Sequence, residues 1–377
     1  MPNDHEGKGR PSTRLRVLMV TPRYLPLIGG VELHVHQVAS RLAERGVEVS
    51  VLTTDTTGGV AAHERRDGFE VRRVRAWPKR RDYYFAPGLY REISASDCDV
   101  VHVQSFHTLV APVAMHASLR ARLPYVVTFH AGGHSARTRG LLRPLQLAAI
   151  RPLLARADRL IALASFEVEE YTRRLRLPLG RFAVIPNGSD LPVAAAESTV
   201  AREPALLASV GRLERYKGHH RVLEALPHVL YRRPEARLRI IGSGPYENEL
   251  RELAGTLGVT SHVEITAIAP ENRAQMASEL ARTAVVVNLS EFETQPLAAL
   301  EALSCGCRLV VAETPGLRSL AYDGLARAVK LDSPPVELAA AILEELARPS
   351  IFDPPQLPTW DDCASSLLEL YGSVVAG

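Results

Sequence analysis

The sequence predicts an α/β protein made of two doubly wound halves, in which parallel strands alternate with crossover helices. Short apolar, β-branched runs recur along the whole chain, and longer segments with helical periodicity separate them. A stretch without periodicity, residues 192–204, reads as a linker and divides the 377 residues into two parts of ordinary domain size. Such an architecture places ligands at the carboxyl ends of the strands, in the crevice between the halves.

The first part, residues 15–191, is expected to form one sheet. A helix is expected from Val31 to Arg45, and Gly46 is the stop signal that ends it. A further, more exposed strand is expected at 69–74. The main strands are expected at 17–20, 47–53, 100–103, 125–129 and 160–162.

The second part, residues 205–355, repeats this scheme, and a last segment, 356–377, follows it. Strands are expected at 206–210, 238–241, 263–265, 284–288 and 309–312. In the last segment apolar side chains share one helical face: Trp360, Ala364, Leu367, Leu368 and Tyr371. A helix with so apolar a face has to dock on another part of the protein.

The composition is that of a soluble globular protein, with 46% apolar and 23% charged residues. A net charge of +3 gives no sign of a nucleic-acid partner. Four cysteines in so long a chain fit reduced thiols, and the polar start, residues 1–14, is expected to be a disordered tail. No signal peptide and no apolar run of ~20 residues is visible, so we expect a cytoplasmic protein.

The most informative segment is NLSEFETQPLAALEALSCGC, residues 288–307. A strand is expected to end where the segment begins, and a helix to start around Pro296 with Thr294 or Gln295 as its cap. Gly306 ends that helix. The free N–H groups and the positive end of the dipole at the helix start suit a diphosphate.

Two carboxylates flank the start of this helix. Glu293 lies just before it and Glu301 two turns later, so both can reach one ligand from different sides. Carboxylates accept hydrogen bonds, and sugar or ribose hydroxyls are neutral donors. The alternative is a surface helix with two solvated glutamates, which the apolar residues around the segment disfavour.

A second segment, VGRLERYKG at 210–218, directly follows a predicted strand. Arg212 and Lys217 are expected on its loop, where two cations can converge on phosphate oxygens. The alternative is exposed surface charge, but the glycines on either side of the loop favour a function. Lysine is scarce in this chain, with only four residues, which adds a little weight to Lys217.

A third segment, PLIGGVE at 26–32, lies between the first strand and the first helix. Gly29 and Gly30 allow a close approach of the backbone to a ligand at a helix N-terminus. A glycine turn without a ligand is an equally good interpretation of this segment alone.

These segments, in this order, resemble the retaining glycosyltransferases of family 4, which have the GT-B fold. The resemblance extends from about Leu15 to Tyr371. It includes TFHA (128–131), IPNGSD (185–190), GRLERYKG (211–218), IGSGP (241–245) and the pair Glu293/Glu301 followed by EALSCG. It implies two Rossmann-like domains that face a deep cleft, the first on the acceptor side and the second on the donor side, with the C-terminal helix crossing back onto the first.

The resemblance also implies roles for the two cations and two carboxylates singled out above in the second part. Arg212 and Lys217 would neutralise the pyrophosphate of a nucleotide diphosphate sugar. Glu301 would hold the ribose hydroxyls, and Glu293 would bind hydroxyls of the transferred sugar. Two cations and a helix dipole would then stabilise the leaving group as a metal does elsewhere, so no metal or other cofactor is expected.

From the first part, His130 would lie beside the reacting sugar. Gly30, next to Gly29, would approach the phosphates or the acceptor. The implied outcome is retention of configuration, by attack of an acceptor hydroxyl on the leaving-group face, with the departing phosphate taking the proton.

The sequence departs from the family pattern at one place. Family members usually carry Gly-Phe-Gly after the first glutamate, whereas this chain has Thr294, Gln295 and Pro296. Pro296 has no N–H, so one expected contact to the diphosphate is missing, but Leu297 and Ala298 still offer theirs. The change puts the donor pose and the sugar in question more than the reaction class.

Several other patterns have simpler explanations. Asp97-Cys98-Asp99 matches a metal-binding D-x-D, but it precedes a predicted strand, where a strand cap is commoner. His130 and His134 have zinc-ligand spacing, but the glycines between them argue against a helix. Residues 137–159 mix arginine with apolar side chains and could rest on a membrane surface if the acceptor were lipid-linked; a solvated arginine face is the commoner case.

Two rivals to sugar transfer stay open. One is a nucleotide-sugar epimerase or hydrolase on the same fold, and the other is a paralogue that binds nucleotide sugar without turnover. The sequence identifies neither the base nor the sugar, nor whether the hydroxyl acceptor is a glycan, a lipid-linked glycan, a cyclitol or another small metabolite. The oligomeric state is equally open.

Overall fold

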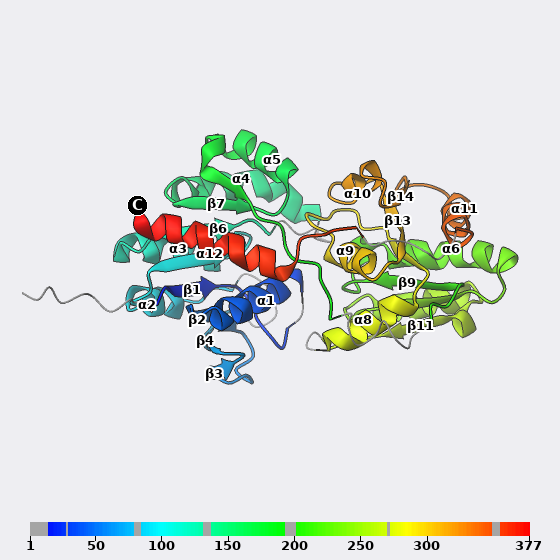
Figure 1. The fold of residues 1–377 in the computed structure, drawn as a ribbon, viewed down its shortest axis with the longest axis horizontal. Helices are drawn as coiled ribbons and strands as arrows, with labels where there is room; N and C mark the ends of the chain where they lie inside the picture. The colour runs from blue at the N-terminus through cyan, green and yellow to red at the C-terminus, as the bar shows by residue number, and fades with distance from the viewer. Residues whose placement is uncertain are drawn as a thin grey trace, which may run out of the picture.

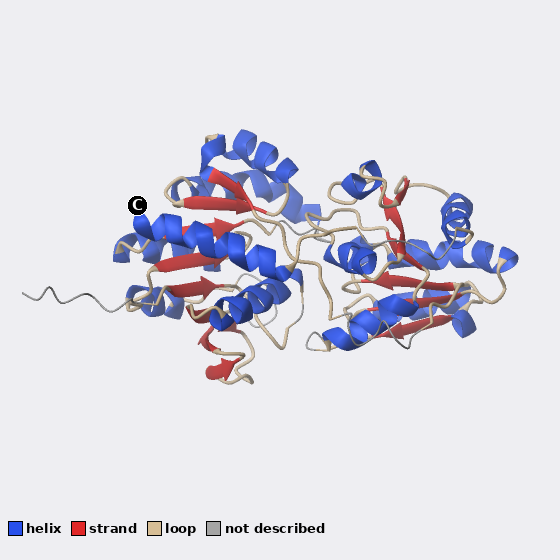
Figure 2. Ribbon diagram, in the orientation of Figure 1, coloured by secondary structure: helices blue, strands red, loops and turns tan. Residues whose placement is uncertain are grey.

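The structure is a computed structural model, and it describes residues 14–27, 29–78, 84–130, 137–192, 201–269, 272–348 and 355–377, with side chains outside 137–144. The chain forms two sheets side by side, each covered by helices on both faces (Figure 2). The predicted doubly wound fold with two parallel-sheet halves is therefore confirmed. Within the described ranges, no helix combines the length and the apolarity that a bilayer span requires.

The first sheet has eight strands in the order β3-β4-β2-β1-β5-β6-β7-β8, all parallel except β3. Its strands are β1 (Arg16–Val20), β2 (Glu48–Asp55), β3 (His63–Arg66), β4 (Phe69–Arg75), β5 (Val100–Gln104), β6 (Tyr125–Thr128), β7 (Arg159–Ala162) and β8 (Phe182–Val184). The helices of this half are α1 (Gly30–Glu44), α2 (Gly88–Ser94), α3 (Val110–Ala121), α4 (Arg137–Leu154) and α5 (Ser165–Leu175).

The second sheet has six strands in the order β11-β10-β9-β12-β13-β14, and all are parallel. Its strands are β9 (Leu206–Val210), β10 (Arg237–Ile241), β11 (Val263–Thr266), β12 (Val285–Asn288), β13 (Arg308–Ala312) and β14 (Arg327–Val329). Its helices are α6 (His219–Arg232), α7 (Glu247–Thr256), α8 (Arg273–Arg282), α9 (Leu297–Ser304), α10 (Arg318–Tyr322) and α11 (Pro335–Leu346).

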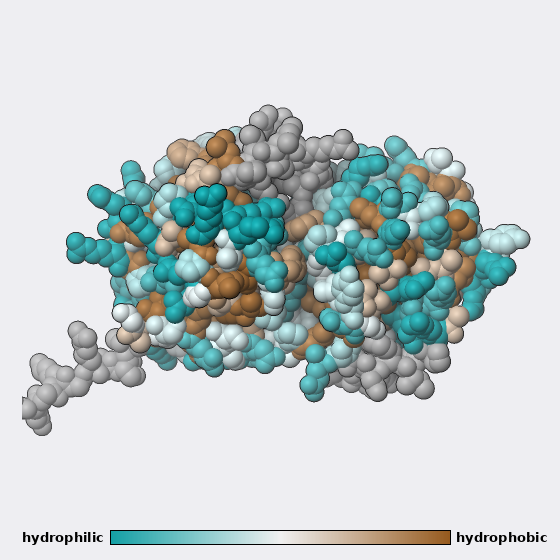
Figure 3. Space-filling view, turned by 90° about the horizontal axis from the view of Figure 1, so that it is seen from above, coloured by the Kyte–Doolittle hydropathy of each residue, from teal (hydrophilic) through white to brown (hydrophobic). Residues whose placement is uncertain are grey.

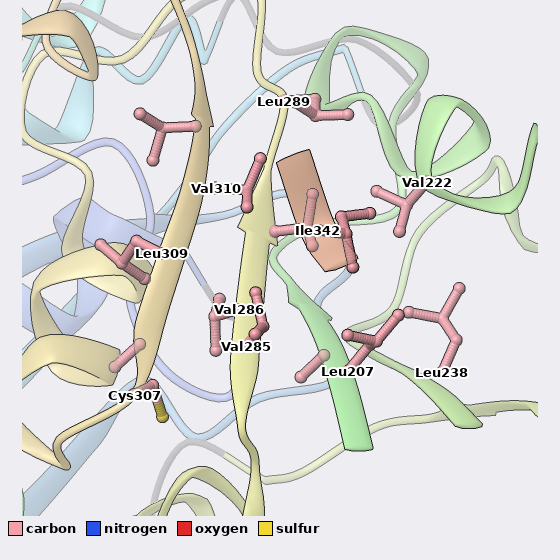
Figure 4. Packing of buried hydrophobic residues seen from close by; sticks show 14 of the residues in the cluster. Leu207, Val222, Leu238, Val285, Val286, Leu289, Cys307, Leu309, Val310 and Ile342 are labelled. Carbon is pink, nitrogen blue, oxygen red and sulfur yellow. The ribbon is translucent and has the colours of Figure 1, made fainter. Parts of the chain in front are cut away.

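The cores explain why these apolar runs become strands. Central strands such as β5 and β12 are buried at every position, as expected of parallel strands covered on both faces. In the first half, alternate residues of β1 belong to two different cores: Leu18 lies in one, and Val17 and Met19 in the other. In the second half, Val286 and Val310 point to opposite faces of the sheet, and Val310 lies on the face where Ile342 of α11 packs (Figure 4).

The last helix, α12 (Trp360–Ala376), returns from the second half and lies along the first, beside α1 (Figure 1). Thr359 and Asp362 form a capping box that fixes where the helix begins. Trp360 and Tyr371 are fully buried against the first half, and the Tyr371 hydroxyl lies 2.5 Å from Nδ1 of His102. The expected crossing of a C-terminal helix back to the first half is confirmed.

The face seen in Figure 3 mixes hydrophilic and hydrophobic residues over both halves. All four cysteines are free and buried, which agrees with the expectation of reduced thiols. Cys307 Sγ lies 3.0 Å from the carbonyl oxygen of Leu280, in the core of the second half. The pair Cys305 and Cys307 therefore contributes to packing.

Candidate active site

The loop between β9 and α6 carries the two predicted cations. Gly218 makes this loop possible, because it adopts a left-handed conformation with φ of 78°. A Cβ at this position would lie 2.2 Å from the carbonyl oxygen of Leu289, at the end of β12. The close crossing brings Lys217 to the carboxyl end of β12, where the segment with Glu293 begins.

Lys217 and Glu293 form a nearly buried ion pair. Nζ of Lys217 lies 2.6 Å from Oε1 of Glu293, and their side chains are only 18% and 14% exposed. The Ser290 hydroxyl donates to the same oxygen at 2.7 Å. Burial acts to lower the pKa of Lys217, but the Glu293 carboxylate outweighs it, and the net shift is upward. The ammonium group is therefore charged at any physiological pH.

Arg212 lies on the same loop and is more open to solvent. Its Nη2 is 2.5 Å from Oε1 of Glu214, and its side chain is 41% exposed. The backbone of Arg212 is fixed from behind, because its carbonyl oxygen lies 3.2 Å from Nε2 of His219. The structure thus brings Arg212, Lys217 and Glu293 to one loop cluster, and the guanidinium of Arg212 is exposed enough to meet a ligand.

Glu301 is buried on α9 and pairs with a residue that the sequence did not point to. Its side chain forms an ion pair with Arg273, the first residue of α8. Burial raises the pKa of Glu301, and the guanidinium of Arg273 acts against that shift. Only the three-dimensional contact of α8 with α9 identifies Arg273, since it lies 28 residues from Glu301 in the sequence.

The start of α9 differs from the expectation. Pro296 is itself the N-cap, no side chain caps the helix, and the first helical residue is Leu297. The prediction that Thr294 or Gln295 caps the helix is therefore wrong. The N–H of Leu297 donates to the carbonyl of Gln295 at 2.9 Å, so it is not free for a diphosphate as expected. Ala298 is the next N–H along the helix start.

Gln295 instead joins the two halves of the molecule. Its side-chain oxygen accepts from the backbone N–H of Asn187 at 2.7 Å, and its side-chain nitrogen donates to the carbonyl of Asn187 at 3.1 Å. The Asn187 side-chain oxygen lies 2.6 Å from Nδ1 of His34, which belongs to α1. The residue that replaces the family's phenylalanine thus links the helix tip of the second half to the first.

The predicted glycines lie at the start of α1, opposite α9. Gly29 is the N-cap and Gly30 the first helical residue. A Cβ on Gly30 would lie 3.8 Å from Cδ1 of Leu297, so this glycine faces the donor half directly. Glu32 was missed: it is 2% exposed, its Oε1 pairs with Arg23 at 2.9 Å, and among the described residues its Oε2 has no hydrogen-bond partner. Its position three residues after a glycine turn was the available signal.

His130 follows β6 and lies in a buried polar cluster. Its Nε2 is 2.8 Å from the side-chain oxygen of Gln104, at the end of β5. Its ring centroid is 4.8 Å from that of His34. Burial lowers the pKa of His34 to about 4 and holds the pKa of His130 well below its ordinary value. Both imidazoles are therefore neutral near pH 7.

The patterns with simpler explanations are partly accounted for. Asp97 and Asp99 both pair with Arg16, at 2.5 and 3.1 Å, next to the start of β5. In the part of the chain that the structure describes, no three metal-ligating side chains come together. His134 lies outside the described residues. Within residues 137–159, the side chains of Leu147 and Ile150 are buried in the protein, so they are not available to a membrane surface. Contact of this segment with a membrane stays a prediction.

Comparison with known families accounts for both halves. Residues 28–192 match the family described as Glycosyltransferase Family 4, and residues 194–350 match the family described as Glycosyl transferases group 1. The chain is 30% identical over 378 residues to a glycogen synthase of Mycobacterium tuberculosis, covering 89% of this chain and 87% of the relative. It is 28% identical to a D-inositol 3-phosphate glycosyltransferase of Nocardiopsis dassonvillei, covering 92% and 90%.

Solved structures share the fold at low sequence identity. Sucrose-phosphate synthase from Thermosynechococcus elongatus superposes with a TM-score of 0.71 at 20% identity, over 96% of this chain and all of that one (100%). HepE of Anabaena, in complex with UDP-glucose, gives 0.69 at 18% identity, over 96% and 98%. The two facing sheets with a returning helix are thus the GT-B architecture. The chain belongs to glycosyltransferase family 4, and it is a glycosyltransferase.

Proposed function

We propose that this enzyme transfers a sugar from a nucleotide diphosphate sugar to a hydroxyl acceptor, with retention of configuration and without a metal. The observation that carries the proposal is the Lys217–Glu293 pair, which lies between the β9–α6 loop and the start of α9. A phosphate-binding cation and a hydroxyl-binding carboxylate at 2.6 Å suit the junction between a diphosphate and its sugar.

The donor class is supported by the relatives. HepE was solved with UDP-glucose, and the two curated relatives named above are a glycosyltransferase and a glycogen synthase. In this chain, Arg212 and Lys217 supply positive charge for the diphosphate, and Glu301 supplies a carboxylate for the ribose. The donor pose and the choice of sugar are the features that the departure from the family pattern at Thr294 to Pro296 would affect.

The leaving group sets the electrostatic demand of the reaction. Breaking the bond between the sugar and the diphosphate builds negative charge on the phosphate and positive charge on the sugar ring. Lys217 is held charged by Glu293, and Arg212 lies on the same loop. Fixed positive charge aimed at the leaving group stabilises the transition state, so we propose that no metal is needed.

The first half supplies the acceptor side in this proposal. His130 and His34 are neutral, so they can hydrogen-bond to hydroxyls without placing a positive charge beside the sugar ring. The acceptor hydroxyl would attack from the leaving-group face, and the departing phosphate would take its proton. The bond to the acceptor then forms on the face from which the diphosphate leaves, which retains the configuration.

A screen of UDP-, GDP- and ADP-sugars against glycan, cyclitol and lipid-linked acceptors tests the proposal. We expect nucleotide release that depends on the acceptor and is unchanged by a chelator. Glu301→Ala is expected to weaken donor binding, because it removes the only predicted ribose ligand. Release without an acceptor would identify a hydrolase or epimerase, and binding without any product would identify a non-catalytic protein.

The proposed site of action is the cytoplasm. All four cysteines are free and buried, which fits a reducing compartment. Contact with a membrane surface through α4 belongs to this proposal only if the acceptor proves to be lipid-linked. Fractionation of cells that express the tagged protein would test both statements, with release of the protein by salt expected for a surface contact.

A further inference from the structure

The ion pair between Arg273 and Glu301 lies where the proposed function places the ribose of the donor. Resting on that proposed donor site, we propose that Arg273 is a positioning residue that keeps the Glu301 carboxylate ionised and oriented to accept the ribose hydroxyls. Neither the sequence pattern nor the family motif singles out Arg273. It belongs to α8, whereas both motif glutamates belong to the segment around α9.

The geometry supports a positioning role. Glu301 has a side chain only 5% exposed, and Arg273 18%. The bond joins Nη2 of Arg273 to Oε1 of Glu301, so Oε2 is the oxygen left to accept from another donor. A buried carboxylate that a guanidinium holds through one oxygen has the direction of its second oxygen restricted. The Ser304 hydroxyl, one turn later, donates to the Glu301 carbonyl at 2.8 Å and leaves the carboxylate itself untouched.

The surroundings of Glu301 favour its neutral form except for Arg273. Burial raises the pKa of this carboxyl, Asp190 raises it further, and Arg273 is the group that acts in the opposite direction. The Cys305 thiol, on the same helix end, is neutral because burial raises its pKa to about 11. A protonated carboxyl has one hydroxyl donor in place of an acceptor lone pair. Loss of Arg273 would therefore leave an acid that accepts ribose hydroxyls poorly near pH 7.

A direct contact between Arg273 and the nucleotide is the competing explanation. Arg273 also lines a cavity of about 580 Å³ between α8 and the first half. The other walls of this cavity are His36, Gln37, Glu64, Arg65, Arg66 and Asp67. A guanidinium stays charged at every accessible pH, so the loss of a direct contact would weaken binding equally at all pH values. The loss of a positioning residue would weaken binding most at low pH.

Nucleotide affinity measured against pH separates the two explanations. UDP, GDP and ADP are titrated calorimetrically into the full chain, and the tightest of them is used from pH 6 to pH 9. For Arg273→Met we expect binding at least tenfold weaker than the parent at pH 6 to 7, with most of the loss recovered at pH 9. Arg273→Lys should follow the parent, because it restores the positive charge. A loss that is the same at every pH, or no loss, would overturn the proposal.

A matched control lies on the same helix. Arg282 ends α8 and pairs with Glu203 at the surface, with side chains 35% and 38% exposed. Arg282→Met removes an arginine from the helix without touching Glu301, so nucleotide affinity should stay within twofold of the parent at every pH. A pH-dependent loss in this variant would show that the effect of Arg273→Met comes from general charge, and it would equally refute the positioning role.

Thermal unfolding without ligand separates this inference from the proposed function. At pH 8, Glu301→Gln should lower the melting temperature of the parent and raise that of Arg273→Met, because an unpaired buried carboxylate is costly. If the parent binds none of the three nucleotides, the proposed donor and the ribose role of Glu301 both fall. If the parent binds nucleotide but Glu301→Gln has the same effect in both backgrounds, only the role of Arg273 falls.

Discussion

Two ion pairs of the second half and three histidines of the first half are buried in opposite ways. On the second half, two pairs set a buried charge against an opposite one, Lys217–Glu293 and Arg273–Glu301. On the first half, His34, His102 and His130 hydrogen-bond to neutral side chains, and burial lowers their pKa values.

This difference follows the chemistry that each side is proposed to serve. A diphosphate leaving group needs positive charge that is already in place, and ion pairs hold that charge ready at a buried site. A sugar ring that becomes cationic is destabilised by a neighbouring imidazolium, so histidines beside it have to stay neutral. Two environments of similar burial thus give opposite protonation states.

The largest expected effect comes from removing the charge of the donor side. Lys217→Ala should lower kcat/KM by about 10³-fold, because it removes a fixed cation from the leaving group and takes from Glu293 the positive charge that lies 2.6 Å from its carboxylate. Steady-state kinetics with the screened donor measures this. Lys330→Ala, at an exposed loop lysine, is the control and should change kcat/KM less than twofold. Near-normal activity in Lys217→Ala would refute the claim that the second half holds a buried charge for the leaving group.

The second prediction concerns stability on the histidine side. His34 is fully buried with a pKa of about 4, against 6.5 for a free histidine. As the pH falls from about 6.5 to 4, His34 therefore becomes protonated in the unfolded chain but stays neutral in the folded chain. Stability should fall over this window, and the share of His34 is on the order of 3 kcal/mol. His34→Gln should flatten the fall by that amount in urea unfolding at pH 7, 5.5 and 4.5.

The exposed His116 provides the matched control for this measurement. His116→Gln should leave the pH dependence of the unfolding free energy unchanged, because this exposed side chain lies outside the buried histidine cluster. An equal flattening in both variants would mean that the histidines of the first half are not held neutral by burial.

A smaller effect is expected where the two sides meet. Gln295→Ala removes two hydrogen bonds to the backbone of Asn187, at 2.7 and 3.1 Å. We expect kcat to fall about tenfold, with nucleotide affinity nearly unchanged, because the bonds align the two halves and do not bind the donor. Gln295→Glu keeps the acceptor oxygen but loses the N–H donor, so its kcat should lie between that of the parent and that of Gln295→Ala. A change in nucleotide affinity alone would place Gln295 in the donor site instead.

The smallest effect is expected at Asp97, outside both sides. Its carboxylate is 87% exposed and pairs with Arg16, so Asp97→Ala removes a surface ion pair of about 0.5 kcal/mol or less. Activity with and without a chelator should stay within twofold of the parent. A chelator-sensitive loss in this variant would restore the metal interpretation of the D-x-D pattern.

The fold was predictable because its strands are apolar runs with clear periodicity. All ten main strands expected from the sequence are present within two residues at each end. The strand expected at 69–74 is β4, in which buried residues alternate with exposed or half-buried ones. The strands that were not predicted are short or polar: β3 reads HERR, and β8 and β14 have three residues each. Such segments become strands only because a sheet edge is available to them.

The site was predictable only where its residues lie close together in the sequence. Arg212 with Lys217, and Glu293 with Glu301, occur within single loop–helix segments, so spacing could suggest them. Arg273, Gln104 and Asn187 act through contacts between distant elements, and the Asn187–Gln295 bonds span 108 residues. The error at the start of α9 has a related cause, since Gln295 was free to cap the helix in the sequence but is engaged by Asn187 in the fold.

The chain passes between the two halves twice, and the two connecting segments touch each other. The Ser189 N–H of the first segment donates to the Pro358 carbonyl of the second at 3.0 Å. At Gly188 a Cβ would lie 2.1 Å from the backbone nitrogen of Trp360, so the two connecting segments are in direct backbone contact. The N–H of Trp360 also donates to the side chain of Asp190 at 2.5 Å. These bonds tie the two connecting segments together, and the contact leaves no room at position 188 for a residue larger than glycine.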